Sequence, residues 1–109
     1  MKEIQSLIEL QDMLAKTRGV MLYFYSDRCA PCISLRPKVI ELINNKFPEI
    51  ELVFINSEKY PDIPAHFGVF SNPSIILFID QREYFRNSKY ISEDQLAEQT
   101  DRLYKMAFQ

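Results

Sequence analysis

Both cysteines of the chain lie in one stretch, Tyr23-Phe24-Tyr25-Ser26-Asp27-Arg28-Cys29-Ala30-Pro31-Cys32. Its first part belongs to a continuous apolar and aromatic run over residues 20–25, which is typical of a strand covered on both faces. Beyond Cys32, apolar side chains recur at helical spacing and stop before Pro48; they are Val39, Ile40, Ile43 and Phe47. The cysteine pair therefore lies where a buried strand ends and a helix begins.

This position has a chemical consequence for the two thiols. Free backbone amides in the first turn of a helix carry partial positive charge, and they favour a thiolate over a thiol. Cys29 stands at the helix start, where it gains this effect and stays accessible, and Arg28 adds a positive charge beside it. Cys32 lies one turn further and is expected to be more shielded, while Pro31 suits a first turn that needs no amide donor. The pair therefore fits dithiol–disulfide exchange, with Cys29 attacking a substrate disulfide and Cys32 resolving the mixed disulfide.

The pattern on either side alternates helices and strands. Residues 6–16 have apolar side chains at helical spacing, and Gly19 is the expected stop. Residues 52–55 and 75–79 are two further runs of the buried-strand type. Between them, prolines limit residues 61–67 to a short helix or an irregular connection.

The last third of the chain predicts a hairpin and a closing helix. A polar stretch before Tyr84-Phe85 indicates a turn into a fourth strand. Ser92 matches a capping box before a helix whose expected buried face is Leu96, Leu103 and Ala107. The whole order predicts an α/β fold, in which a βαβ unit and a ββα unit share a central mixed four-stranded sheet. Helices cover both faces, and one extra helix precedes the first strand.

Composition and charge limit the class of protein. The chain has 109 residues, 47% hydrophobic and 26% charged, which fits a single soluble domain over residues 1–109. A net charge of −2 argues against a dedicated nucleic-acid binder. No apolar run approaches the roughly 20 residues that cross a bilayer, and residues 1–4 lack the apolar core of a signal peptide. We therefore expect a cytoplasmic protein that binds neither nucleic acid nor membranes. In such a reducing compartment a close cysteine pair is more often catalytic, redox-sensing or metal-binding than a structural staple.

Two segments resemble the signatures of the thioredoxin family. They are residues 23–32, with Pro37 further along the helix, and residues 67–78, with Pro73 at the start of the third strand. Their spacing and the closing helix also fit, so the resemblance covers nearly the whole chain. It implies a thioredoxin-like fold, a redox-active Cys29–Cys32 disulfide without a bound metal or organic cofactor, and a cis peptide bond before Pro73. The backbone at Asn72 and Pro73 would then dock substrate peptides. The resemblance further implies protein disulfides as substrates, thioredoxin reductase or glutathione as electron donor, and a role in cell redox homeostasis.

Several positions depart from the family's pattern. Arg28 replaces the usual tryptophan before the first cysteine, and Ala30 replaces the usual glycine. Tyr23 stands in place of the buried aspartate that helps to remove the proton from the second cysteine, and Phe54 replaces its lysine partner. A tyrosine, with an ordinary pKa near 10, is a poor base at neutral pH. We therefore expect a divergent thioredoxin-like protein in which Arg28, Ala30, Pro31 and Tyr23 tune the site and the mixed disulfide is resolved slowly.

Other interpretations of the same residues stay open. The cysteines are alternatively inert buried thiols, or join His66 in a zinc site shared between chains, since one chain lacks four soft ligands. The protein is alternatively a redox-weak binding or adaptor module, or an oxidant or isomerase for one dedicated substrate. Phe70 and Tyr25 are expected to be packing residues. Glu58 and Asp80 are candidates for a replacement base near Cys32.

Overall fold

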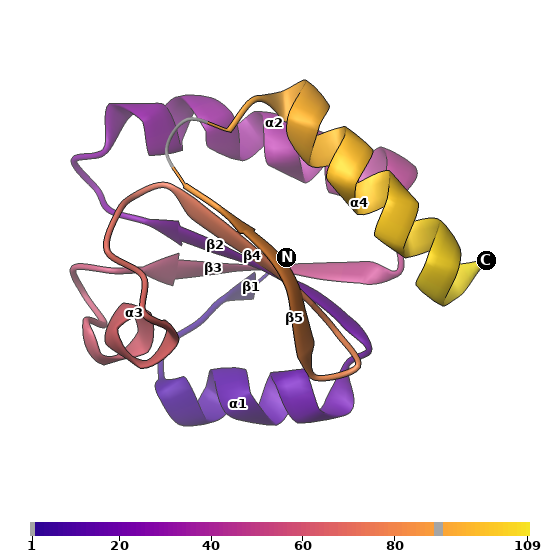
Figure 1. Ribbon diagram of the computed structural model, residues 1–109. Helices are drawn as coiled ribbons and strands as arrows, with labels where there is room; N and C mark the ends of the chain where they lie inside the picture. Colours follow the sequence, from indigo (N-terminus) through magenta and orange to yellow (C-terminus); the bar gives the residue numbers. More distant parts are fainter. Residues whose placement is uncertain (1, 89–90) are drawn as a thin grey trace.

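The computed structural model describes residues 2–88 and 91–109, which form alternating strands and helices (Figure 1). In chain order these are β1 (Lys2–Glu3), α1 (Leu7–Lys16), β2 (Gly19–Tyr25), α2 (Ala30–Lys46), β3 (Ile50–Asn56), α3 (Asp62–Phe67), β4 (Ser74–Ile79), β5 (Arg82–Asn87) and α4 (Glu93–Phe108). None of these helices is both long and apolar enough to cross a membrane.

The strands of the described residues form one mixed sheet in the order β1-β3-β2-β4-β5. β2 and β3 are parallel, with Leu22 opposite Val53, as the predicted βαβ unit requires. β4 runs antiparallel to β2, and β5 runs antiparallel to β4, which confirms the predicted hairpin. The predicted count of four strands is wrong by one, because β1 adds a fifth strand parallel to β3. β1 has only two residues, both exposed, and so carries no apolar pattern that a sequence reading can detect.

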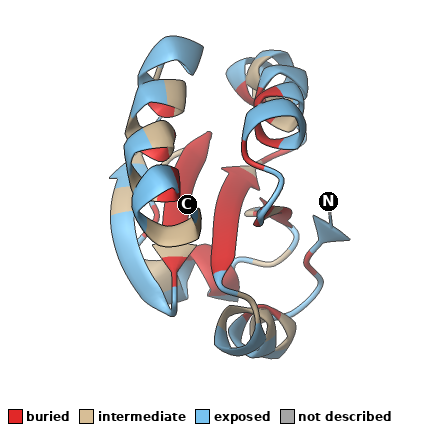
Figure 2. Ribbon diagram, turned by 90° about the vertical axis from the view of Figure 1, so that its right-hand side faces the viewer, coloured by how far each residue is buried: buried red, intermediate tan, exposed pale blue. Residues whose placement is uncertain are grey.

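Helices cover both faces of the sheet, as predicted. Figure 1 shows α2 and α4 on one face and α1 and α3 on the other. Side chains of β2 alternate between the two layers: Met21 and Tyr23 pack under α2 and α4, whereas Leu22 and Phe24 pack on the opposite side. The central strands are buried, and the outer faces of the helices are exposed (Figure 2). This alternation directs Tyr23 toward the helix that carries the cysteines.

Two details of the core differ from the sequence prediction. Gly19 does not end α1, which is capped by Thr17; it begins β2, where a Cβ atom would approach the Phe108 ring to 2.9 Å. On α4, the capping box of Ser92 is present, but the buried positions after Leu96 are Thr100 and Tyr104. The predicted Leu103 and Ala107 lie at the half-buried edge of that face. The buried residues of α4 recur every four residues. The polar Thr100 among them obscures the apolar pattern in the sequence.

The topology brings two distant segments to one end of the sheet. β2 ends at Tyr25 and leads into α2, while β4 begins at Ser74, which lies opposite Phe24 of β2. The start of α2 and the segment between α3 and β4 therefore lie at the same end of the molecule (Figure 1). Both segments that resemble family signatures lie at this end.

Candidate active site

The site is built on the Cys29–Cys32 disulfide, whose Cα atoms are 5.2 Å apart. Cys29 is the N-cap of α2, and its Sγ accepts a hydrogen bond from the backbone N–H of Cys32 at 3.2 Å. Cys29 is half-buried, whereas Cys32 is only 1% exposed. The structure thus has the asymmetry that the strand-to-helix position predicts, with one accessible sulfur at the helix start and one shielded sulfur behind it.

The neighbours of Cys29 in the chain face solvent. Arg28, Ala30 and Pro31 are all exposed, and Pro31 lies in the first turn of α2. Arg28 makes no ion pair with any residue in the ranges 2–88 and 91–109, so its charge is free to act near Cys29. The proline suits this turn because no amide donor is needed there. The tuning of Cys29 by Arg28, Ala30 and Pro31 stays a prediction.

Aromatic side chains close the inner side of Cys32. Tyr23 is fully buried, and its hydroxyl donates a hydrogen bond to the backbone carbonyl of Cys32 at 2.6 Å. Burial raises the pKa of Tyr23 from 10.0 to about 12. Phe54 packs edge-on against Tyr23, with 5.5 Å between ring centroids. Tyr23 is therefore a core residue, as expected, and its hydroxyl stays protonated at neutral pH.

Charged side chains lie on the outer side of Cys32, around a pocket of about 210 Å³. The pocket is lined by Tyr25, Ser26, Asp27, Cys32, Ile33 and Arg36. An Arg36 Nη atom lies 2.6 Å from a Glu3 carboxylate oxygen, and the Tyr25 hydroxyl donates to the other Glu3 oxygen at 2.7 Å. We call Glu3, Tyr25 and Arg36 the outer cluster.

The outer cluster was not predicted from the sequence. One signal for Arg36 was available, since it follows Cys32 by four residues and so shares its face of the helix. No comparable signal exists for Glu3, because it reaches the site through the two-residue strand β1. Asp27 also lines the pocket and accepts a hydrogen bond from the Asn56 side chain at 3.2 Å.

The segment before β4 is tied to the end of β2. The Asn72–Pro73 peptide bond is cis, and Pro73 is buried. The Asn72 side-chain oxygen accepts a hydrogen bond from the Ser57 hydroxyl at 3.0 Å, and the Ser57 N–H donates to the Tyr25 carbonyl at 2.8 Å. Ser57 is a further residue that the sequence reading missed. These bonds hold Asn72 and Pro73 near the point where the chain turns toward Cys29, while their docking of substrate stays a prediction.

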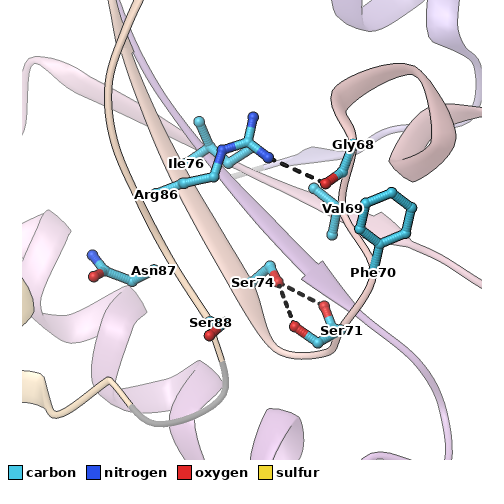
Figure 3. A pocket seen from close by; sticks show the side chains of 9 residues that line it. All are labelled: Gly68, Val69, Phe70, Ser71, Ser74, Ile76, Arg86, Asn87 and Ser88. Carbon is cyan, nitrogen blue, oxygen red and sulfur yellow. Dashed lines mark hydrogen bonds between the residues drawn. The ribbon is translucent and has the colours of Figure 1, made fainter.

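Phe70 is not the packing residue that the sequence predicts. Its side chain is 93% exposed, so it does not pack in the core, whereas Tyr25 is half-buried as a packing residue would be. Phe70 borders a pocket of about 250 Å³, in which Arg86 donates to the Gly68 carbonyl and Ser74 bonds to Ser71 (Figure 3). Ile33, directly after Cys32, is also 65% exposed. Apolar surface is therefore present in both segments that meet at this end of the sheet.

Three titratable candidates lie elsewhere. Asp80 pairs with Arg18 at 2.9 Å in the turn after β4, near the opposite end of β2, so it is not a replacement base for Cys32. Glu58 is exposed after β3, and the structure records no contact between its side chain and Cys32 within the described ranges. His66 is exposed on α3 and packs against Phe67, consistent with a surface role. Within residues 2–88 and 91–109, no three His, Cys, Asp or Glu side chains gather as metal ligands would.

Sequence comparisons agree with this geometry. The family model described as Thioredoxin matches residues 5–102. The chain is 26% identical over 106 residues to "Thioredoxin-like protein YdfQ" of Bacillus subtilis (strain 168), which covers 97% of this chain and 94% of that protein. It is 28% identical over 76 residues to a thioredoxin of Mycoplasma genitalium, which covers 70% of this chain and 74% of that protein.

Solved structures share the architecture. The X-ray structure of Fasciola hepatica thioredoxin matches with a TM-score of 0.85 and 24% identity over 94% of this chain and 98% of that one. A mutant thioredoxin from Halobacterium salinarum matches with a TM-score of 0.82 and 24% identity over 98% of this chain and 89% of that one. At such identity the likeness shows the fold alone, and it confirms the predicted fold class.

Proposed function

This chain belongs to the thioredoxin family, and on that premise we propose that it reduces protein disulfides through Cys29 and Cys32. The observation that supports this best is the asymmetry of the two sulfurs. The sulfur of half-buried Cys29 accepts a backbone N–H, while Cys32 is 1% exposed behind it. A hydrogen bond to the charged form lowers a thiol's pKa, and the thiolate is the nucleophile in disulfide exchange. Cys29 is therefore the attacking residue and Cys32 the resolving residue.

The proposed reaction moves two electrons from the dithiol to the substrate. The Cys29 thiolate attacks one substrate sulfur, the substrate S–S bond breaks, and the second substrate sulfur leaves as a thiolate that takes a proton from water. Cys32 then attacks Cys29 as a thiolate. The Cys29–Cys32 bond forms, and the first substrate sulfur leaves with the electron pair of the broken bond. An external thiol or dithiol, from glutathione or a thioredoxin reductase, returns the protein to its reduced state.

The remaining predicted residues have supporting roles in this proposal. The backbone at Asn72 and Pro73 docks an extended substrate segment, and Arg28, Ala30 and Pro31 tune Cys29. The cytoplasm is the proposed compartment, because a reducing environment keeps the pair in its active form. Redox homeostasis of the cell is the corresponding process.

Resolution is proposed to be slower than in thioredoxins with a buried aspartate. Tyr23, with a pKa raised to about 12, cannot accept the Cys32 proton near pH 7. Stopped-flow measurement of the resolving step should show a faster rate in Tyr23→Asp than in the wild type. An unchanged or slower rate in a folded Tyr23→Asp protein would contradict this part of the proposal.

Reduction of insulin disulfides in the presence of dithiothreitol tests the function itself. Cys29→Ser should lose the catalysed rate, and Cys32→Ser, incubated in reduced form with insulin after dithiothreitol is removed, should accumulate a mixed disulfide with the substrate. Circular dichroism of both variants serves as the folding control. A Cys29→Ser variant that still catalyses the reduction would overturn the proposal.

An adaptor function is the second candidate, because Phe70 and Ile33 are exposed by 93% and 65% near the site. An adaptor keeps its partner in Cys29→Ser, whereas a reductase loses its activity. The exposed cation Arg28 favours the third candidate, an oxidant or isomerase, since it stabilises the reduced thiolate. The reduction potential separates the two redox roles: a value near about −270 mV fits a reductant, and about −120 to −180 mV fits an oxidant or isomerase.

A further inference from the structure

Arg36 is placed to act on Cys32 from the solvent side. It follows Cys32 by one helical turn in α2, so the two side chains share a face, and both line the 210 Å³ pocket. Asp27 is the other formally charged residue that lines this pocket. Among the described residues that line this pocket, Arg36 is therefore the one cation. It lies on the same helix face as Cys32, which carries the resolving sulfur.

The guanidinium of Arg36 is held in place by the outer cluster and by Phe54. It lies 3.8 Å from the Phe54 ring centroid and 4.9 Å from the Tyr25 ring centroid. Glu3 binds it at 2.6 Å, and Tyr25 donates to the same carboxylate. β1 positions Glu3, because the next residue, Ile4, is buried and donates its N–H to the Phe54 carbonyl at 2.8 Å. Such contacts leave the cation few alternative positions.

On the inner side of Cys32, the contacts among the described residues come from neutral side chains, which cannot perform the same role. The Tyr23 hydroxyl donates a hydrogen bond to the Cys32 carbonyl, and Phe54 is apolar. A charge that stabilises the Cys32 thiolate is therefore found, among the described residues around Cys32, on the outer side. The charge of Arg36 already acts on this interior, since it opposes the rise in the pKa of Tyr23 that burial causes. The titratable groups around Cys32 and Arg36 are Tyr23, Tyr25, Asp27 and Glu3.

We propose that Arg36 is a positioning residue of the resolving step, which stabilises the Cys32 thiolate while Glu3 limits the charge that Cys32 experiences. The Cys32 proton leaves to water in the outer pocket. The thiolate then attacks the Cys29 sulfur of the mixed disulfide, and the bond from Cys29 to the substrate breaks with release of the substrate thiolate. The inference rests on the proposed function, because it assigns a role within that reaction.

The pKa of Cys32 tests the proposal directly. In a Cys29→Ser background Cys32 is the one thiol of the chain, and its thiolate is followed by absorbance at 240 nm across pH. Arg36→Gln should raise the pKa of Cys32 by about one unit, because it removes the cation that lines the same pocket as Cys32 and a neighbouring cation favours the charged form. Arg36→Lys should restore most of the shift. Glu3→Gln should move the pKa in the opposite direction, since it keeps an acceptor for Arg36 and removes the negative charge.

Lys38→Gln is the matched control, because it removes one exposed cation from the same helix without touching the outer pocket. It should leave the pKa of Cys32 unchanged. An unchanged pKa in Arg36→Gln, or shifts of the same sign in Arg36→Gln and Glu3→Gln, would overturn the proposal. If Arg36→Gln does not fold, Glu3→Gln decides it, because a pKa of Cys32 that does not fall in that variant would overturn the proposal.

The titration needs no turnover, so it is separable from the test of the proposed function. Failure to reduce insulin would contradict the proposed reductase and leave the titration result standing. An unchanged pKa of Cys32 in Arg36→Gln would overturn the role of Arg36 and leave the proposed reductase function standing. In the protein with both cysteines, Arg36→Gln should also slow the resolving step severalfold near pH 7, and the difference should shrink at high pH as the thiolate forms without help.

Discussion

The inner and outer sides of Cys32 are built from different chemistry. On the inner side Tyr23 and Phe54 are buried and neutral, and they belong to the main core cluster. On the outer side Arg36 and Glu3 form an ion pair whose side chains are 31% and 47% exposed. A buried charge costs several kcal/mol of desolvation, whereas a half-exposed pair avoids most of that cost and is partly screened by solvent. Stability is thus expected from the inner side and electrostatic control of Cys32 from the outer side.

The largest expected effect is on the inner side. Phe54→Ala should lower the free energy of unfolding by about 3–5 kcal/mol, because it leaves a cavity beside Tyr23. Phe70→Ala is the matched control: the same change at a 93% exposed position should alter stability by less than about 0.5 kcal/mol. Urea unfolding of both variants measures the difference. Equal losses of stability in the two variants would contradict the expected difference between buried and exposed aromatic residues at this end of the sheet.

The next largest effect is expected at alkaline pH, where ionisation of Tyr23 on the inner side should lower the free energy of unfolding. Burial raises the folded-state pKa of Tyr23 to about 12, above the unfolded value near 10. Its contribution is therefore fully present below pH 10 and is lost as the pH rises toward 12, by up to about 3 kcal/mol. The measurement is urea unfolding at pH 8 and pH 11 for the wild type and Tyr23→Phe. The wild type should lose more stability than the variant, and equal losses would show that Tyr23 titrates normally.

At neutral pH the Tyr23 hydroxyl should have a smaller effect. Tyr23→Phe removes its hydrogen bond to the buried Cys32 carbonyl and should cost about 1 kcal/mol of stability. The pH dependence of the resolving step between pH 6 and 9 should stay the same, because the hydroxyl is not the base. A changed pH profile, measured by stopped flow, would show that the Tyr23 hydroxyl takes part in the proton transfer from Cys32.

The smallest stability effect is expected on the outer side. Arg36→Gln should lower the free energy of unfolding by less than about 1 kcal/mol, as is usual for a partly exposed ion pair. The same variant should nevertheless shift the pKa of Cys32. Urea unfolding at pH 7 checks the first statement, and a loss as large as that of Phe54→Ala would mean that Arg36 is mainly a packing residue over the Phe54 ring.

Local signals in the sequence were enough for the fold class and for the positions of the two sulfurs. The buried run of β2, the cysteine pair and Pro31 at the start of α2, and the capping box of Ser92 each depend on residues within one turn or one strand. Such patterns follow from backbone periodicity and from the unpaired amides of a helix start. The accessibility of Cys29 and the burial of Cys32 and Tyr23 follow from the same local arguments.

Only the tertiary structure decided what surrounds Cys32. Glu3 and Arg36 are 33 residues apart in the chain, and they meet because β1 pairs with β3 beside the start of α2. Two exposed residues carry no period, so neither the fifth strand nor its carboxylate can be predicted from the sequence. The exposure of Phe70 was equally hidden, since an aromatic side chain is usually buried and only the folded segment before β4 turns it to solvent. Local patterns specify which elements form, whereas the partners of a charged or aromatic side chain depend on the long-range contacts that the sheet order creates.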